Sequence, residues 1–281
     1  MGKRKAFTLI ELLVVIAIIA ILMAILMPAL ERVKEQARGV ACMSNQKTMG
    51  MAYVMYYDEN DSRICGGMAR YAPINGVPPW VMPPLDYEGA GNFRQMPNGP
   101  VTLEQRHNGL REGALFPYIR DVGAYHCPGD DRIRRGTHNG RELQHLLYRS
   151  YSLPDFLRAY ERSDPKKITD FTSPATKMLF VEEIYDAPGR VNHNVDGWSY
   201  RPGTNTLWDP LGLYHSDSCT FSFMDGHAEV KKWTDKRTLI YWRSRSEAES
   251  MGFGKDTPFN PPNEDLLWLD RHYPGKTLYA Q

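Results

Sequence analysis

Four cysteines are the residues of this 281-residue chain whose side chains could do the most chemistry. They are Cys42, Cys65, Cys127 and Cys219. Thiols pair in an oxidising compartment or bind metals, but the sequence lacks the C-x-x-C spacing that would favour a zinc ribbon or a redox site. Four cysteines allow three full pairings. We favour Cys42 with Cys127, because Pro128 and a short helix before it could lie along a long N-terminal helix. Buried free thiols are the alternative.

Histidines close to aspartates are a second candidate ligand set. The pairs are His193 with Asp196, His215 with Asp217, and His227 with Asp225. A metal site needs convergent ligands that further hydrogen bonds orient. Oxygen donors of the segment Asn192–Asp196 could hold Ca²⁺, but the spacing of an EF-hand loop is absent. We expect no metal and no other cofactor, with Ca²⁺ as the alternative.

Motifs of known catalytic sites are missing from the sequence. It contains no G-x-S-x-G, no H-E-x-x-H and no phosphate-binding loop. Glu182 and Glu183 are adjacent on an expected strand, so their side chains point to opposite faces and cannot share one site. Six tryptophans could form a sugar-stacking platform, although scattered tryptophans more often anchor cores or interfaces. We therefore expect that the chain is not an enzyme. The alternative is an exported glycan-binding domain or enzyme that an N-terminal helix anchors in the membrane.

The distribution of charge and hydropathy points to a membrane. Lys and Arg number 34 against 33 Asp and Glu, which leaves no excess for a large nucleic-acid-binding face. Residues 12–30 form a run of 19 uncharged residues, and such a helix is about 28 Å long, close to the ~30 Å hydrocarbon core. Lys3, Arg4 and Lys5 precede it, and positive flanks stay cytoplasmic. We expect one span, a cytoplasmic N-terminus and an exported remainder.

Two residues of this apolar region are not needed in a plain anchor. Glu11 lies at its entry, where a carboxylate costs a few kcal/mol unless it is paired. Pro28 lies near its far end, where it removes a backbone hydrogen bond and favours a kink. Both indicate that the helix does more than hold the chain in a bilayer.

The segment Lys5–Val15, KAFTLIELLVV, resembles the prepilin cleavage and methylation motif of type IV pilins and type II secretion pseudopilins. The resemblance implies that a membrane peptidase cuts between Ala6 and Phe7 and methylates the new amino terminus. The family usually has Gly before the cut; Ala is the next smallest side chain, so cleavage is expected. Glu11 is the fifth residue after the cut, and a proline late in the span, here Pro28, is common in the family.

This resemblance implies a function in assembly. A subunit that leaves the bilayer for a filament packs its helix against copies of itself, and Glu11 would meet the amino terminus of Phe7 on a neighbour as a paired charge. The implied role is a structural subunit of a type IV pilus-like or type II secretion pseudopilus filament, stored in the inner membrane before assembly. The implied partners are prepilin peptidase, other pilin-like subunits, the assembly machinery and membrane lipid.

One helix is expected from Phe7 to Asn60, about 80 Å long. We predict that its second half buries a stripe of small or apolar residues at helical spacing. The stripe consists of Val33, Ala37, Val40, Ala41, Ser44, Thr48, Met51 and Met55. The expected divisions are a leader at 1–6, a transmembrane or filament-core half at 7–30, a spine half at 31–62 and an exported globular domain at 63–281.

Shorter elements are expected in the exported domain. Residues 63–114 hold many Gly and Pro and are predicted to be irregular, and a short helix is predicted close to residue 119. Strands are expected at 149–153 and 177–182. A hairpin is expected from two alternating runs, 219–224 and 227–233, joined by a type I′ turn at Asp225-Gly226. The fold class is therefore α+β: a long N-terminal helix packed against a small antiparallel sheet, as in pilins.

His215, nine further residues and Asp225-Gly226 are similar to the H-x9-DG segment of pilin-like proteins from planctomycete-type bacteria. His215 could hydrogen-bond the turn at Asp225. Because six of the intervening residues form a strand about 20 Å long, we predict instead that a fold-back of residues 216–218 holds it, or that it caps a loop near residues 192–198. Its replacement by alanine would then cost on the order of 1–2 kcal/mol, and added metal would have no effect.

Overall fold

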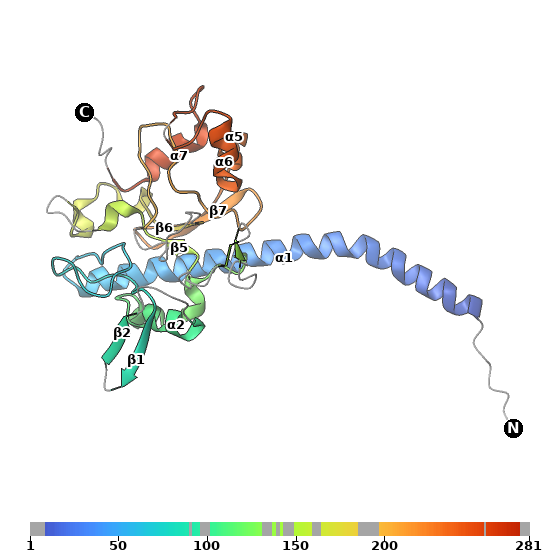
Figure 1. Ribbon diagram of the computed structural model, residues 1–281, viewed down its shortest axis with the longest axis horizontal. Helices are drawn as coiled ribbons and strands as arrows, with labels where there is room; N and C mark the ends of the chain where they lie inside the picture. Colours follow the sequence, from blue (N-terminus) through green and yellow to red (C-terminus); the bar gives the residue numbers. More distant parts are fainter. Residues whose placement is uncertain are drawn as a thin grey trace.

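The computed structural model describes residues 9–89, 92–95, 102–130, 137–138, 141–142, 149–158, 164–184, 197–255 and 257–275. Its longest element is α1, Leu9–Glu59, a helix of 51 residues that contains Pro28 without interruption. At 1.5 Å per residue α1 is about 76 Å long. Its N-terminal part stands clear of the remaining chain and bends away from it, whereas its C-terminal part runs through the globular domain (Figure 1). The predicted long helix is confirmed.

The face of α1 that the domain covers differs from the predicted one. The buried residues are Cys42, Gln46, Met49, Gly50, Ala52, Tyr53 and Tyr56. The predicted stripe lies on the opposite side, with Val33 58% and Val40 63% exposed. The prediction was wrong because it favoured small apolar side chains. The domain instead packs against tyrosine rings, whose hydroxyls find partners: Tyr53 donates to the backbone oxygen of Cys65.

A four-stranded antiparallel sheet lies against α1, which confirms the predicted fold class. Its order is β5 (Tyr151–Ser152), β6 (Met178–Glu182), β7 (Ser218–Phe223) and β8 (Ala228–Lys232). Alternation along β7 separates two cores: Phe221 faces away from the helix, whereas Thr220 bonds helix residues Cys42 and Gln46. β6 is buried throughout because both faces of the sheet are covered.

Residues 63–114 contain more regular structure than the sequence predicted. They include the hairpin of β1 (Leu85–Gly89) and β2 (Asn92–Gln95), and the helix α2 (Leu103–Arg111). The start of α2 is a capping box in which Thr102 and Gln105 bond each other's backbone N–H groups. This four-residue signal is present in the sequence, but the surrounding Gly and Pro obscured it.

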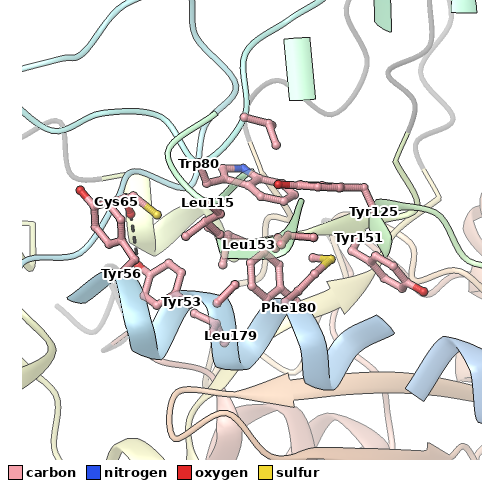
Figure 2. Packing of buried hydrophobic residues seen from close by; sticks show 14 of the residues in the cluster. Tyr53, Tyr56, Cys65, Trp80, Leu115, Tyr125, Tyr151, Leu153, Leu179 and Phe180 are labelled. Atoms are coloured by element: carbon pink, nitrogen blue, oxygen red, sulfur yellow. Dashed lines mark hydrogen bonds between the residues drawn. The ribbon is translucent and has the colours of Figure 1, made fainter. Parts of the chain in front are cut away.

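The core between α1, the sheet and this region is aromatic. Trp80 stacks on Tyr125 with ring centroids 6.0 Å apart and lies 5.1 Å from Phe180 of β6 (Figure 2). The Trp80 indole N–H donates to the backbone oxygen of Gly67 at 3.0 Å, so its polar atom is satisfied. The remaining short helical turns lie around this core or beside β7. These are α3 (Phe116–Ile119) and the 3₁₀ turns Val122–Tyr125, Asp155–Arg158, Ile168–Asp170 and Pro174–Thr176.

Three helices that were not predicted from the sequence cover the other face of the sheet. They are α5 (Lys236–Arg243), α6 (Arg245–Ser250) and α7 (Glu264–His272). Each begins at a side chain that accepts a backbone N–H: Asp235, Ser244 and Asn263. Two further strands of two residues each, β3 (Thr137–His138) and β4 (Arg141–Glu142), form a separate pair.

The Asp225-Gly226 turn joins β7 and β8 in a different geometry from the predicted one. Gly226 has φ +87°, but Asp225 is absent from the positive-φ residues, so the turn is not type I′. Gly226 N–H donates to Phe223 O and Phe223 N–H to His227 O, each at 2.9 Å. This is a three-residue loop in which only the last residue needs a left-handed backbone. The turn also touches α1, since a Cβ on Gly226 would lie 2.6 Å from Met51 Sδ.

A Gly226→Ala substitution is expected to destabilise the chain by about 1–2 kcal/mol, chiefly from left-handed strain, with a small addition because the flexible Met51 side chain must move away from the new Cβ. Gly252→Ala is the matched control, because Gly252 has φ +84° with nothing within 4 Å of a Cβ. The control should cost about 1 kcal/mol, which is the strain alone. Urea unfolding of both variants measures the difference. Equal losses would show that the Met51 side chain moves aside without cost.

Candidate functional site

The exposed N-terminal half of α1 is the first candidate site. Within the described residues, α1 is the one helix whose length and composition suit a membrane span. Its apolar side chains are open, with Ile10 75% and Ile25 71% exposed, and Glu11 lies in its first turn. A helix with such a surface needs lipid or other helices around it. Ala6 and Phe7, the predicted cleavage residues, lie outside the described residues.

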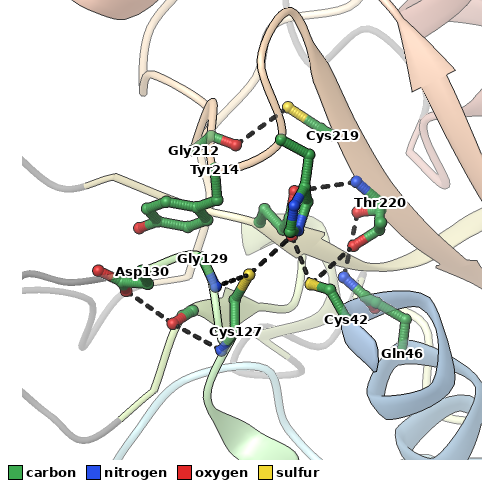
Figure 3. Close-up of polar contacts among 12 residues, drawn as sticks. Cys42, Gln46, Cys127, Gly129, Asp130, Gly212, Tyr214, Cys219 and Thr220 are labelled. Carbon is green, nitrogen blue, oxygen red and sulfur yellow. Dashed lines mark hydrogen bonds and ion pairs between the residues drawn. The ribbon is translucent and has the colours of Figure 1, made fainter. Parts of the chain in front are cut away.

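The second candidate site is a buried cluster of Cys42, Cys127, Glu182 and His215. Cys42 comes from α1 and Cys127 from the turn after the 3₁₀ helix Val122–Tyr125, and their thiols lie near each other (Figure 3). Glu182 ends β6, and His215 precedes β7. One potential ligand atom from each residue lies within 4.8 Å of the others.

Short polar contacts hold the four side chains together. The Cys42 thiol donates to Glu182 Oε1 at 2.6 Å. His215 Nε2 lies 3.2 Å from Glu182 Oε1 and 3.2 Å from Cys127 Sγ. All four residues are buried. Their polar atoms therefore interact where solvent screens them little.

A further set of hydrogen bonds orients the cluster. Thr220 N–H donates to Glu182 Oε2 at 2.9 Å, and Gly129 N–H to Cys127 Sγ at 3.3 Å. The Tyr151 hydroxyl lies 2.9 Å from Cys42 Sγ. The far ring nitrogen of His215, Nδ1, faces Glu35 Oε1 of α1 at 3.7 Å.

The turn that carries Cys127 is braced separately. Ser150 Oγ donates to Asp130 and accepts from Cys127 N–H at 3.0 Å, while Asp130 N–H closes the turn onto Cys127 O at 2.9 Å. These bonds fix the Cys127 backbone independently of its thiol.

Burial and neighbouring charge set the protonation of the cluster. Burial raises the pKa of the Cys42 thiol and of the Cys127 thiol, so both are protonated and unreactive at neutral pH. Burial by itself would lower the pKa of His215, but hydrogen bonds to Cys42 and Glu182 and the charge of Glu182 raise it to about 10. The protonated form of His215 is therefore favoured beside the Glu182 side chain and the two thiols.

Cys42 and Cys127 come together as predicted, but the predicted disulfide is not formed in the structure. All four cysteines are free and buried, the alternative that the sequence left open. The two thiols lie close to each other, and they also bond the Glu182 carboxyl group and the His215 imidazole.

The predictions for His215 are partly right. Ser218 N–H donates to its backbone oxygen at 3.1 Å, and Ser216 takes φ +57°, so residues 216–218 fold back as expected. Asp225 bonds its neighbour His227, and not His215. Residues 192–196 of the predicted loop 192–198 lie outside the described residues. The side chain of His215 bonds Cys127 and Glu182, which sequence spacing did not indicate.

Glu182 is the site residue that sequence reasoning missed. The two adjacent glutamates do point apart, since Glu182 meets Cys42 whereas Glu183 accepts the Ser152 hydroxyl. The sequence contained a signal for this residue. Two glutamates follow directly on four apolar residues of a strand, and a carboxylate that is buried with such a strand needs hydrogen-bond or charge partners. Trp80, Trp198 and Trp233 are also fully buried, so these three rings belong to the core.

Comparison with known proteins adds one match. The prokaryotic N-terminal methylation motif matches residues 1–27. No curated protein matches the chain. No solved structure matches it either. The motif implies processing by prepilin peptidase. Together with a long helix, apolar and exposed in its first half, against an antiparallel sheet, it makes the chain a pilin-like protein with an N-terminal methylation motif.

Proposed function

We propose that the chain is a structural subunit of a type IV pilus-like or type II secretion pseudopilus filament, and not an enzyme. The observation that carries the proposal is the exposed apolar half of α1, which lies largely within the methylation motif at residues 1–27. Such a surface suits lipid before assembly and the helices of neighbouring subunits afterwards, without a change in the fold.

The second half of α1 supports the same role. Val33, Val40 and Met55 are between 47% and 63% exposed and lie on one face, opposite the face that the domain covers. This face was predicted to be buried within the domain. We assign it instead to helices of other subunits, because it continues the exposed apolar surface of the first half.

The proposal includes a location and partners. Before assembly the subunit is a single-pass protein of the inner membrane, with its N-terminus in the cytoplasm and the domain 63–281 exported. Its partners are prepilin peptidase, other pilin-like subunits, the assembly machinery and membrane lipid. The likeness to the H-x9-DG segment of planctomycete-type pilin-like proteins supports this role. His215 contacts the turn at Cys127, and Gly226 packs against Met51 of α1.

Negative-stain microscopy of cells that express the chain with a pilus or secretion assembly system tests the proposal. We expect filaments that an antibody to the exported domain decorates. Processed protein that stays in the membrane as single subunits, with binding to a glycan array or a catalytic activity, would favour the rival role of an anchored binding domain or enzyme.

We expect a host with prepilin peptidase to remove Met1–Ala6 and to add one methyl group to Phe7. Intact-mass measurement of membrane-extracted protein checks both changes at once. Ala6→Gly is the matched control, since it restores the smallest side chain before the cut and should be processed at least as fast. An unprocessed chain beside a fully processed control pilin would contradict the assignment.

A further inference from the structure

We propose that Cys42, Cys127, Glu182 and His215 form a structural Zn²⁺ site that fastens the spine helix α1 to the exported domain. Each ligand comes from a different segment: α1, the turn at Cys127, the end of β6 and the loop before β7. The cluster lies apart from the exposed surfaces that carry the assembly role, so this inference does not depend on that role.

The donor atoms select the metal. Two sulfurs and an imidazole nitrogen with one carboxylate oxygen suit Zn²⁺, whereas Ca²⁺ and Mg²⁺ bind oxygen donors. Four protein ligands in a buried pocket leave no open position, which is the arrangement of a structural site. The Ca²⁺ alternative of the sequence analysis concerned other residues and is not part of this site.

The distances are close to those that tetrahedral zinc requires. Zn–ligand bonds of about 2.0–2.3 Å place neighbouring ligand atoms roughly 3.3–3.8 Å apart. His215 Nε2 already lies 3.2 Å from both Glu182 Oε1 and Cys127 Sγ. The Cys42 Sγ–Glu182 Oε1 contact of 2.6 Å is held by the thiol proton. That contact lengthens by about 1 Å when the proton leaves and the ion enters.

The surrounding residues match the orienting shell of a metal site. The second nitrogen of a ligating histidine usually faces a carboxylate, a backbone carbonyl or water, and His215 Nδ1 faces Glu35 Oε1 at 3.7 Å. The N–H of Gly129 and the hydroxyl of Tyr151 reach the two sulfurs, as suits thiolates. Thr220 N–H holds the Glu182 oxygen that would not bind the metal.

Zn²⁺ binding requires both thiols to lose their protons and His215 Nε2 to be free of its proton, because a proton and the metal compete for each donor atom. Bound metal also keeps the two sulfurs apart from each other in an oxidising compartment, where a pair of close thiols would otherwise be open to disulfide formation.

Metal titration of the full-length chain in detergent tests the proposal. The chain is reduced, stripped with EDTA, freed of chelator and titrated with zinc chloride. We expect one equivalent to bind and the Tm to rise by roughly 10 °C at a thousandfold excess over the dissociation constant. Cobalt chloride in place of zinc should produce thiolate-to-metal charge-transfer absorption and the visible bands of a tetrahedral ion.

Two variants locate the site. Cys127→Ser should abolish the cobalt spectrum, whereas Cys65→Ser, at an equally buried thiol outside the cluster, should retain it. X-ray absorption of zinc on the wild-type chain gives the ligand count without any variant, and we expect two sulfurs and two lighter ligands. No binding by the reduced chain, or a Cys42–Cys127 disulfide in peptide maps of protein isolated without reductant, would overturn the proposal.

Discussion

A Glu11→Val chain is expected to enter the membrane normally and to form few or no filaments. A carboxylate at the entry of an apolar span costs a few kcal/mol to insert, so its replacement by valine is not expected to hinder insertion. A defect in assembly must then come from the loss of a charge partner, which we assign to the methylated amino terminus of Phe7 on a neighbouring subunit. Filament counts by negative-stain microscopy, with membrane fractionation in parallel, measure both effects.

Glu11→Asp is the matched control for this experiment. It retains the charge on a shorter side chain, and we expect it to assemble partly where Glu11→Val does not. Both variants should be cleaved before Phe7, which intact mass checks. Glu11→Val filaments as abundant as those of the wild type would show that the carboxylate has no role in docking.

A His215→Ala chain, reduced and metal-free, is expected to lose on the order of 3 kcal/mol of its free energy of unfolding. This loss is larger than the 1–2 kcal/mol expected from the sequence for a single hydrogen bond, because the structure places His215 beside a buried carboxyl group. Removal of the imidazolium leaves the carboxylate of Glu182 buried without its cation, and an uncompensated buried charge is costly. Urea unfolding at neutral pH in the presence of EDTA measures the loss.

A double-mutant cycle separates this cause from loss of packing. Glu182→Gln keeps the shape of the side chain and an acceptor for Thr220 N–H, but carries no charge. Because the double variant His215→Ala/Glu182→Gln has no stranded carboxylate, it should lose clearly less stability than the sum of the two single variants. Additive losses would mean that His215 stabilises the domain through packing alone.

Local patterns in the sequence determined the elements of this protein. The uncharged run 12–30 and the motif around Glu11 predict a long exposed helix, and the alternating runs on either side of Asp225-Gly226 predict the β7–β8 hairpin. Helical and strand periodicities repeat within a few residues, so a single segment of the chain is enough to recognise its secondary structure. The same holds for the capping box at Thr102, which is visible in the sequence.

Tertiary structure decided which faces meet and which side chains gather. Two faces of α1 could pack against the domain. The domain covers the face with Tyr53 and Gln46, because the polar atoms of both side chains form hydrogen bonds there. The buried cluster joins residues 88 and 140 positions apart, His215 with Cys127 and Cys42 with Glu182. No spacing in a sequence encodes such a meeting, since it follows from packing β6 and β7 against a helix that is itself positioned by the rest of the core.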